Sequence, residues 1–178
     1  MKKFLFLLTA IFFALPAFAA GTLEVSVSSY TGVVPKNGIR IPFLTIHASA
    51  RNELVQISEV RVRRTGLSED NDIARLIAIT NDYRRSLNAG INEGIATLRF
   101  QKPITIPAGE STDIVVYGNL QMIATSGRTI GLALESIESD AEEVIPIEKQ
   151  ITPFVKTPQT KPSFKIVCQN RKCVRVRR

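Results

Sequence analysis

Few residues in this sequence have the types and spacing that chemistry at a site requires. His47 is the single histidine, and it falls on the polar side of a predicted strand, where we expect it to be solvated. Nucleophilic catalysis needs a Ser, Cys or Thr beside a base, and no Gly-x-Ser-x-Gly elbow occurs. A pair of carboxylates could carry out hydrolysis, but sequence does not give their separation in space. We therefore expect a non-catalytic protein and keep a carboxylate-dependent hydrolase as the alternative.

The loop that contains Glu69, Asp70 and Asp72 is the candidate for a metal site. Carboxylate oxygens at alternate positions of a loop suit a hard cation such as calcium. The loop lacks the glycine and the distal glutamate of an EF-hand, and a solvated loop explains the same residues. We expect no cofactor, with calcium at this loop as the alternative. A second acidic group is interpreted as a solvated loop: Glu135, Glu138, Asp140, Glu142 and Glu143.

Cys168 and Cys173 lie in two short runs of apolar and basic residues, 164–168 and 173–177, with four residues between the runs. This pattern predicts a β-hairpin with a four-residue turn. In an exported protein, two such cysteines are expected to form a disulfide with each other. A metal site fails on ligand count, because two cysteines supply half of a tetrahedral site and no histidine lies nearby.

Basic residues concentrate at the same end of the chain. All 16 acidic residues lie between Glu24 and Glu148, whereas eight basic residues and no acidic one lie between Lys156 and Arg178. The tail is therefore the source of most of the positive charge in a chain of net charge +7, and the body is mildly acidic. We expect an anionic surface polymer or another surface protein to contact the tail, with a purely solubilising tail as the alternative. The residues expected at that contact are Lys165, Arg171, Lys172, Arg175, Arg177 and Arg178.

Residues 1–19 have the three parts of a secretory signal peptide. Lys2 and Lys3 precede an apolar run over 4–15, and the small-residue site Ala17-Phe18-Ala19 follows. The apolar run is shorter than the roughly 20 residues that cross a bilayer, so we expect no transmembrane anchor in the mature chain. The protein is therefore expected in the periplasm, at the cell surface or outside the cell. Specific nucleic-acid binding is not expected, because the chain is exported and has no tryptophan.

The elements between these ends are short strands separated by Gly, Pro, Asn and Asp turns. Their spacing predicts an all-β fold, a β-sandwich of about seven to nine strands over residues 20–152. A Pro/Thr/Lys linker is expected over 153–163, and the disulfide-closed basic hairpin over 164–178. Helix-period patterning does not persist anywhere in the mature chain.

Local patterns add detail to the predicted β-sandwich. Alternation places the apolar residues of 44–50 on one face and His47 on the other. The apolar phase slips within 54–65, which predicts a β-bulge near Ser58-Glu59 or a break between two strands there. Arg61 and Arg63 share the outward side of this run, and we interpret them as an edge or a solvated face. Residues 73–80 are expected to form a strand, with one helical turn over 73–76 as the alternative.

The phrases Arg64-Thr65-Gly66-Leu67, Asp72-Ile73 and Ile106-Pro107-Ala108-Gly109, together with the strand 96–100, occur in an order that is similar to an immunoglobulin-like module of exported bacterial surface proteins. The resemblance spans residues 21–137 and consists mainly of turn chemistry. It implies that the β-sandwich is immunoglobulin-like and has a surface or adhesion context, and it brings no catalytic residues. The single copy and the basic hairpin depart from that module, which often occurs in repeats.

The function expected from these features is an exported structural or binding module at the cell surface or in the periplasm. The alternative is a periplasmic assembly or pilus-associated subunit that pairs through an edge strand. An exposed, unpaired edge would favour the assembly subunit, and edges covered by loops would favour the independent module.

Overall fold

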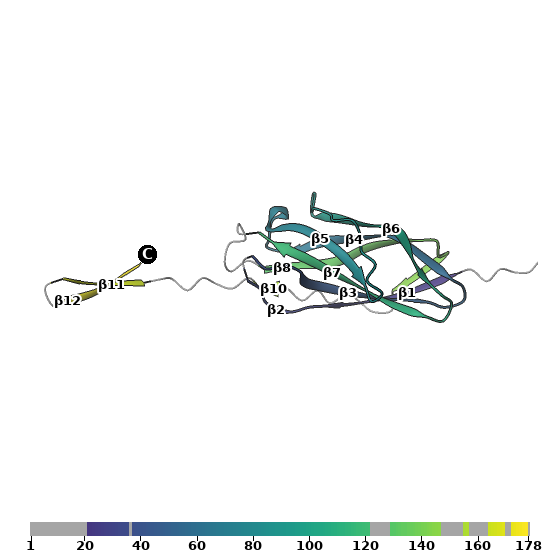
Figure 1. The fold of residues 1–178 in the computed structure, drawn as a ribbon, viewed down its shortest axis with the longest axis horizontal. Helices are drawn as coiled ribbons and strands as arrows, with labels where there is room; N and C mark the ends of the chain where they lie inside the picture. Colours follow the sequence, from purple (N-terminus) through teal and green to yellow (C-terminus); the bar gives the residue numbers. More distant parts are fainter. Residues whose placement is uncertain are drawn as a thin grey trace, which may run out of the picture.

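Two five-stranded sheets face each other around one hydrophobic core (Figure 1). The computed structural model describes residues 21–35, 37–121 and 129–146, and the backbone of three strands at 155–156, 164–169 and 172–177. The first sheet has the order β5-β7-β3-β1-β9 and the second β2-β10-β8-β4-β6. The strands of the first sheet are β5 (Ile73–Thr80), β7 (Ser111–Leu120), β3 (Ile41–Ala50), β1 (Thr22–Ser29) and β9 (Glu143–Pro146). Those of the second are β2 (Gly32–Val33), β10 (Val155–Lys156), β8 (Thr129–Ser139), β4 (Val55–Gly66) and β6 (Ile95–Ile106).

The β-sandwich is confirmed, with ten strands in place of the expected seven to nine. The additional strands are short: β2 and β10 have two residues each, and β10 lies within the predicted linker. β2 pairs with β10, and β10 pairs with β8, which extends the second sheet to Lys156. The rest of the predicted linker, 153–154 and 157–163, and the predicted signal peptide lie outside the described residues.

Side-chain alternation explains why each sheet is apolar on one face only. In β3, Leu44, Ile46, Ala48 and Ala50 are fully buried, as predicted, and His47 is exposed. The residues 23 and 25 of β1 are buried beside them, while the intervening positions face outward. Packing the two apolar faces together removes both from water, and this burial is the main stabilising term of such a sandwich.

The β-bulge predicted near Ser58-Glu59 is present. The register of β4 shifts between Ile57 and Glu59 against both of its neighbours, β6 and β8. One extra residue returns the apolar side chains to the core, so Ile57 and Val60 are both fully buried although they are three residues apart. Residues 73–80 form the predicted strand, β5, and not the alternative helical turn over 73–76. A single helical turn, η1 (Asp70–Asp72), precedes this strand.

In the part of the chain that the structure describes, no helix is long and apolar enough to span a membrane.

Gly118 in β7 accommodates the largest buried side chain of the core. A Cβ atom at position 118 would lie 2.6 Å from Cε2 of Phe43 and 3.1 Å from Cδ2 of Leu76. Phe43 itself is 2% exposed and sits at a register shift between Pro42 and Leu44. The aromatic ring therefore occupies the space that a side chain at position 118 would need.

Gly118→Ala is expected to lower the free energy of unfolding by about 1–3 kcal/mol, because the added methyl group overpacks the core against Phe43. Chemical denaturation of the two proteins measures the difference. Gly90→Ala is the matched control, since a Cβ at Gly90 meets no atom within 4 Å. Equal effects of the two substitutions would contradict this account of the core.

Candidate functional site

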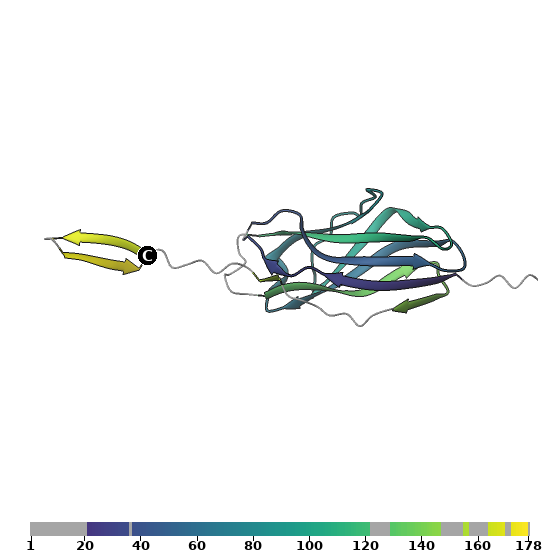
Figure 2. The ribbon, with the colours of Figure 1, turned by 90° about the horizontal axis from the view of Figure 1, so that it is seen from below.

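The basic hairpin is formed by β11 (Phe164–Gln169) and β12 (Lys172–Arg177), which pair antiparallel as a sheet of their own (Figure 2). Cys168 is directly opposite Cys173. Residues opposite each other in an antiparallel pair have Cα atoms about 4.5–5.5 Å apart, within the range that a disulfide spans. The structure describes only the backbone of the two cysteines, so the disulfide stays a prediction, with which this register is compatible.

The register divides the predicted anion-binding residues between the two faces of the hairpin. Arg175 and Arg177 pair with Ile166 and Phe164, and alternation places these positions on the same face as the cysteines. Lys165 and Lys172 fall on the opposite face by the same alternation. Arg171 and Arg178 lie outside the described residues. The backbone therefore groups the two arginines of β12 with each other and separates them from the two lysines.

The acidic loop uses its carboxylates to hold the chain. Asp70 accepts hydrogen bonds from Arg64 Nε at 2.7 Å and from the backbone N–H of Gly94 at 3.0 Å. Asp72 accepts from the backbone N–H of Glu69 at 2.8 Å, and the two residues form a capping box around η1. Burial alone would raise the Asp70 pKa, but the bonds from Arg64 and Gly94 outweigh it and hold this pKa below its usual value. A calcium ion bound by Asp70 would have to compete with the Arg64 guanidinium.

The residues that the structure describes contain no group of three or more His, Cys, Asp or Glu arranged to hold a metal ion.

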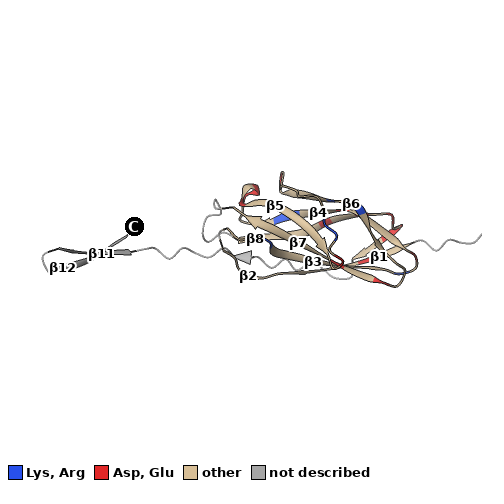
Figure 3. Cartoon of the chain, in the orientation of Figure 1, with Lys and Arg blue, Asp and Glu red and all other residues tan. Residues whose placement is uncertain are grey.

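The arginines of β4 are paired with carboxylates across the outer face of the second sheet. Basic and acidic residues are interspersed over the sandwich (Figure 3). Arg63 donates to Glu135 with Nε at 2.6 Å, and Arg61 lies 3.8 Å from Glu138. Because β4 lies between β8 and β6, the interpretation of these arginines as an edge is wrong, and they belong to a solvated face. Glu135 and Glu138 are strand residues of β8, and Glu143 is the first residue of β9, so the acidic-loop interpretation is also wrong for those three.

Glu59 is the buried member of this ionic network. The residue at the β4 bulge is 3% exposed, and its two carboxylate oxygens accept from Arg61 Nε at 2.7 Å and from Arg99 Nε at 2.6 Å. Burial by itself would raise the Glu59 pKa, yet the hydrogen bonds from Arg99 and Arg61 and their positive charges bring it below the ordinary 4.5. A buried carboxylate that is bonded at both oxygens is stabilising only while it stays ionised.

Three residues from neighbouring strands form a hydrogen-bonded array that sequence reasoning missed. His47 Nδ1 lies 2.7 Å from Asp113 Oδ1, and Nε2 lies 3.1 Å from Ser28 Oγ. A carboxylate can only accept, so Nδ1–H donates to Asp113, and Nε2 of the neutral ring then accepts from Ser28. Asp113 is the register partner of His47 in β7, which no local sequence signal could reveal.

The Ser28–His47–Asp113 array has the connectivity of a serine-hydrolase triad without its surroundings. The side chains of His47 and Asp113 are 46% and 53% exposed, and Ser28 is also exposed. A triad depends on an aspartate that is buried and on donors aimed at the developing oxyanion in a site that excludes water. The array is therefore a cross-strand interaction on a solvated sheet face, and its geometry alone does not make Ser28 a nucleophile.

Glu59→Gln is expected to lower the free energy of unfolding at pH 7 by about 1–3 kcal/mol, because hydrogen bonds from two charged donors lose their ionised acceptor. The pKa of Glu59 is lower in the folded chain than in the unfolded one, so its ionic stabilisation is fully present above pH 4.5 and is lost as pH falls below that value. Thermal unfolding from pH 7 down to acid should therefore show a shallower decline for Glu59→Gln than for the parent. Parallel declines would contradict the role of this carboxylate.

Ser28 is expected to form no covalent adduct with a fluorophosphonate probe, because water reaches His47 and Asp113 freely. Intact-mass spectrometry of the treated protein measures this. The finding that would overturn it is an adduct mapped to Ser28 that disappears in His47→Ala, which would show that the array activates the hydroxyl group.

Comparison with known proteins does not assign the chain to a family. No protein-family model matches it, and no curated protein matches it. Among solved structures, the seventh ScaB type I cohesin from Pseudobacteroides cellulosolvens is similar, with a TM-score of 0.40 and 10% identity over 79% of this chain and 94% of that chain. Self-complemented MyfA, the major subunit of Myf fimbriae from Yersinia enterocolitica, has a TM-score of 0.27 and 15% identity over 75% and 98%. At these values neither similarity carries a conclusion about function, and the β-sandwich rests on the two sheets themselves.

Proposed function

We propose that this chain is an exported, non-catalytic binding module whose C-terminal hairpin contacts an anionic surface polymer or an acidic face of another surface protein. The observation that carries the proposal is the segregation of charge. The segment from Lys156 to Arg178 has eight basic residues and no acidic residue, so it has no carboxylates of its own to neutralise it. Within the hairpin, the register places Arg175 and Arg177 at alternate positions of one strand, on the same face.

The sandwich supports this role as a scaffold whose outer strands are covered on one side. Residues of the segment 85–89 form bridges to both outer strands: Ile79 pairs with Arg85, Leu76 with Ala89, and Phe100 with Ser86. These bridges lie along β5 and β6, the strands at one side of the two sheets. At the other side, β10 pairs with only Thr129 and Ile130 of β8, and β9 pairs with only residues 22–25 of β1, so among the described residues no strand pairs with the rest of β8 on that side. Strand addition needs an open edge of several residues, so the covered side at β5 and β6 favours an independent module, and the side at β8 keeps assembly by strand pairing as the alternative.

A disulfide between Cys168 and Cys173 would give the hairpin a defined shape. A two-stranded hairpin alone is marginal in water, and closing so small a loop contributes about 2 kcal/mol by restricting the unfolded segment. The oxidised hairpin would then present Arg175 and Arg177 in one geometry. The proposal therefore includes the disulfide as a structural element of the binding site.

The full chain is expected to bind dextran sulfate at low salt and to lose most of that affinity at physiological salt, because screening weakens exposed charge contacts. Arg175→Gln/Arg177→Gln should weaken binding more than the matched double variant Lys165→Gln/Lys172→Gln, which removes the same charge from the other face. Fluorescence anisotropy of a labelled polymer measures both effects.

Uncharged dextran is the control ligand. Binding that is insensitive to salt, or that survives in both double variants, would contradict a role for the hairpin. Equal weakening by the two double variants would contradict the grouping of the arginines, and would leave diffuse attraction by the tail as the explanation.

A further inference from the structure

Most arginines of the described sandwich are neutralised by a carboxylate of the chain. The paired arginines and their partners are Arg51 with Glu24, Arg61 and Arg99 with Glu59, Arg63 with Glu135, Arg64 with Asp70, and Arg84 with Asp82. Three others, Arg40, Arg75 and Arg85, form no ion pair with any residue that the structure describes. These same three line one hollow of about 270 Å³.

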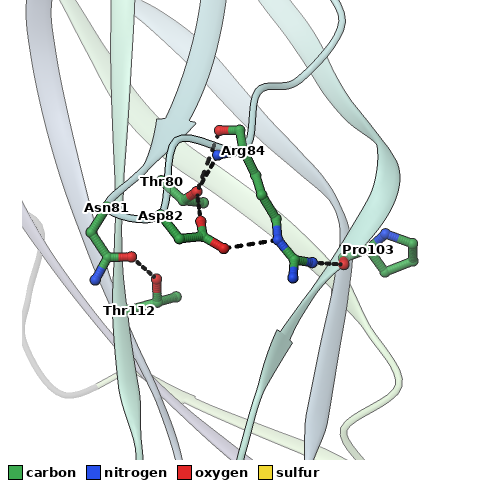
Figure 4. Close-up of polar contacts among 6 residues, drawn as sticks. All are labelled: Thr80, Asn81, Asp82, Arg84, Pro103 and Thr112. Atoms are coloured by element: carbon green, nitrogen blue, oxygen red, sulfur yellow. Dashed lines mark hydrogen bonds and ion pairs between the residues drawn. The ribbon is translucent and has the colours of Figure 1, made fainter.

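The neighbours Arg84 and Arg85 differ in this respect. Figure 4 shows the contacts of Arg84. Arg84 Nε donates to Asp82 at 2.8 Å, and another of its nitrogens donates to the backbone carbonyl of Pro103 at 2.8 Å. Thr80 bonds Asp82 in turn and also accepts from the backbone N–H of Arg84 at 3.0 Å. Arg84 is thus part of the turn, whereas the exposed Arg85 is left with its charge directed to no carboxylate of the described chain.

Arg40 reaches the hollow from a turn held in an uncommon backbone conformation. Its φ is 53°, in the left-handed region that residues other than glycine rarely adopt. Its backbone N–H donates to Asn119 Oδ1 at 2.9 Å, and the turn is tied to β7 again by a 2.9 Å bond from the Leu120 N–H to the Gly38 carbonyl. A strained backbone conformation at an exposed arginine without an ion pair points to a functional role for that side chain.

Arg75 and Arg85 come from two further elements. Arg75 lies in β5 at a register shift and is the partner of Asn119 in β7. Arg85 is bridged to Ile79 of β5, and its segment is anchored by the reciprocal backbone bonds between Leu76 and Ala89, at 2.7 and 3.0 Å. Three separately anchored segments therefore bring three like charges to one hollow, an arrangement that a bound anion would favour.

The remaining lining residues define what kind of anion would fit. Asn88 and Asn119 supply amide groups, and Ile39 and Ile77 supply apolar surface, with Ile39 76% exposed. Asn119 uses its carbonyl oxygen on Arg40, which leaves its NH2 group to donate to a ligand. Guanidinium groups match a carboxylate in a two-bond geometry, amides match hydroxyl groups, and isoleucines match the C–H face of a sugar ring.

We propose that this hollow binds the carboxylate of an acidic saccharide unit, with Arg40, Arg75 and Arg85 as its cationic ligands. The hollow is at the small end of ligand sites, which suits one sugar unit. A second hollow of about 530 Å³ shares Arg85 and adds Arg84, Gln101 and Lys102, so a neighbouring acidic unit of the same polymer has a place beside it. The site goes beyond the function proposed for the hairpin, because it lies in the sandwich.

The test is a calorimetric titration of the full chain with a short oligogalacturonate. Arg75→Gln is expected to reduce the affinity by about tenfold or more, since it removes a charged donor. Arg75→Lys should also weaken binding, because lysine keeps the charge but lacks the planar fork. Arg40→Gly removes the side chain while relieving the positive φ, so it should fold at least as stably as the parent and still bind poorly.

Arg51 is paired with Glu24 and does not line the hollow. Arg51→Gln and the hairpin variant Arg175→Gln/Arg177→Gln should therefore both keep the affinity for the oligosaccharide. Loss of binding in the hairpin variant alone would overturn the site and leave the hairpin proposal standing. Equal binding of the methyl-esterified oligogalacturonate, or of inorganic phosphate, would overturn the assignment to an acidic sugar. Binding to anionic vesicles that is lost in Arg75→Gln would assign the site to a lipid surface and overturn it as well.

Discussion

Alternation along β4 constrains the rest of the sandwich, because this central strand pairs with both β6 and β8 and must face the core over its whole length. The extra residue at Ser58-Glu59 makes this possible by restoring the apolar phase after Ile57. The same bulge places the Glu59 side chain out of contact with water. Arg61 and Arg99, from β4 itself and from β6, then satisfy its charge. Packing and electrostatics are thus coupled at one residue.

The arginines of the described part of the sandwich fall into two physical classes. Those of β4 and of the turn at Asp82 are bonded to carboxylates or carbonyls at defined distances, so their guanidinium groups hold strands and turns together. Those around the 270 Å³ hollow have no such partner in the described residues. Exposed ion pairs contribute little to stability individually, but an unpaired arginine retains its full capacity to bind a ligand. The absence of a carboxylate beside Arg85 is therefore more informative than the presence of one beside Arg84.

Sequence alone predicted the features that depend on local periodicity. The inward residues of β3, the bulge in β4 and the strand at Ile73 all follow from the spacing of apolar side chains. The side-by-side arrangement of distant strands could not be predicted in this way. Ser28, His47 and Asp113 meet only because β1, β3 and β7 are neighbours, and the hollow combines a turn, a strand and a bridging segment. Glu135 and Glu138 looked like loop residues because the arginines that pair with them lie some 70 positions earlier in the chain.

The position of β1 has a consequence for the order in which the protein folds. This first strand lies between β3 and β9, and its parallel partner β9 ends at Pro146, so the first sheet cannot be completed until nearly all of the sandwich has been made. Pairings this distant in sequence form slowly, because the closure entropy of the intervening chain must be overcome first. A chain that crosses a membrane from its N-terminus would consequently remain extended during transit and would fold only after its last strands had arrived.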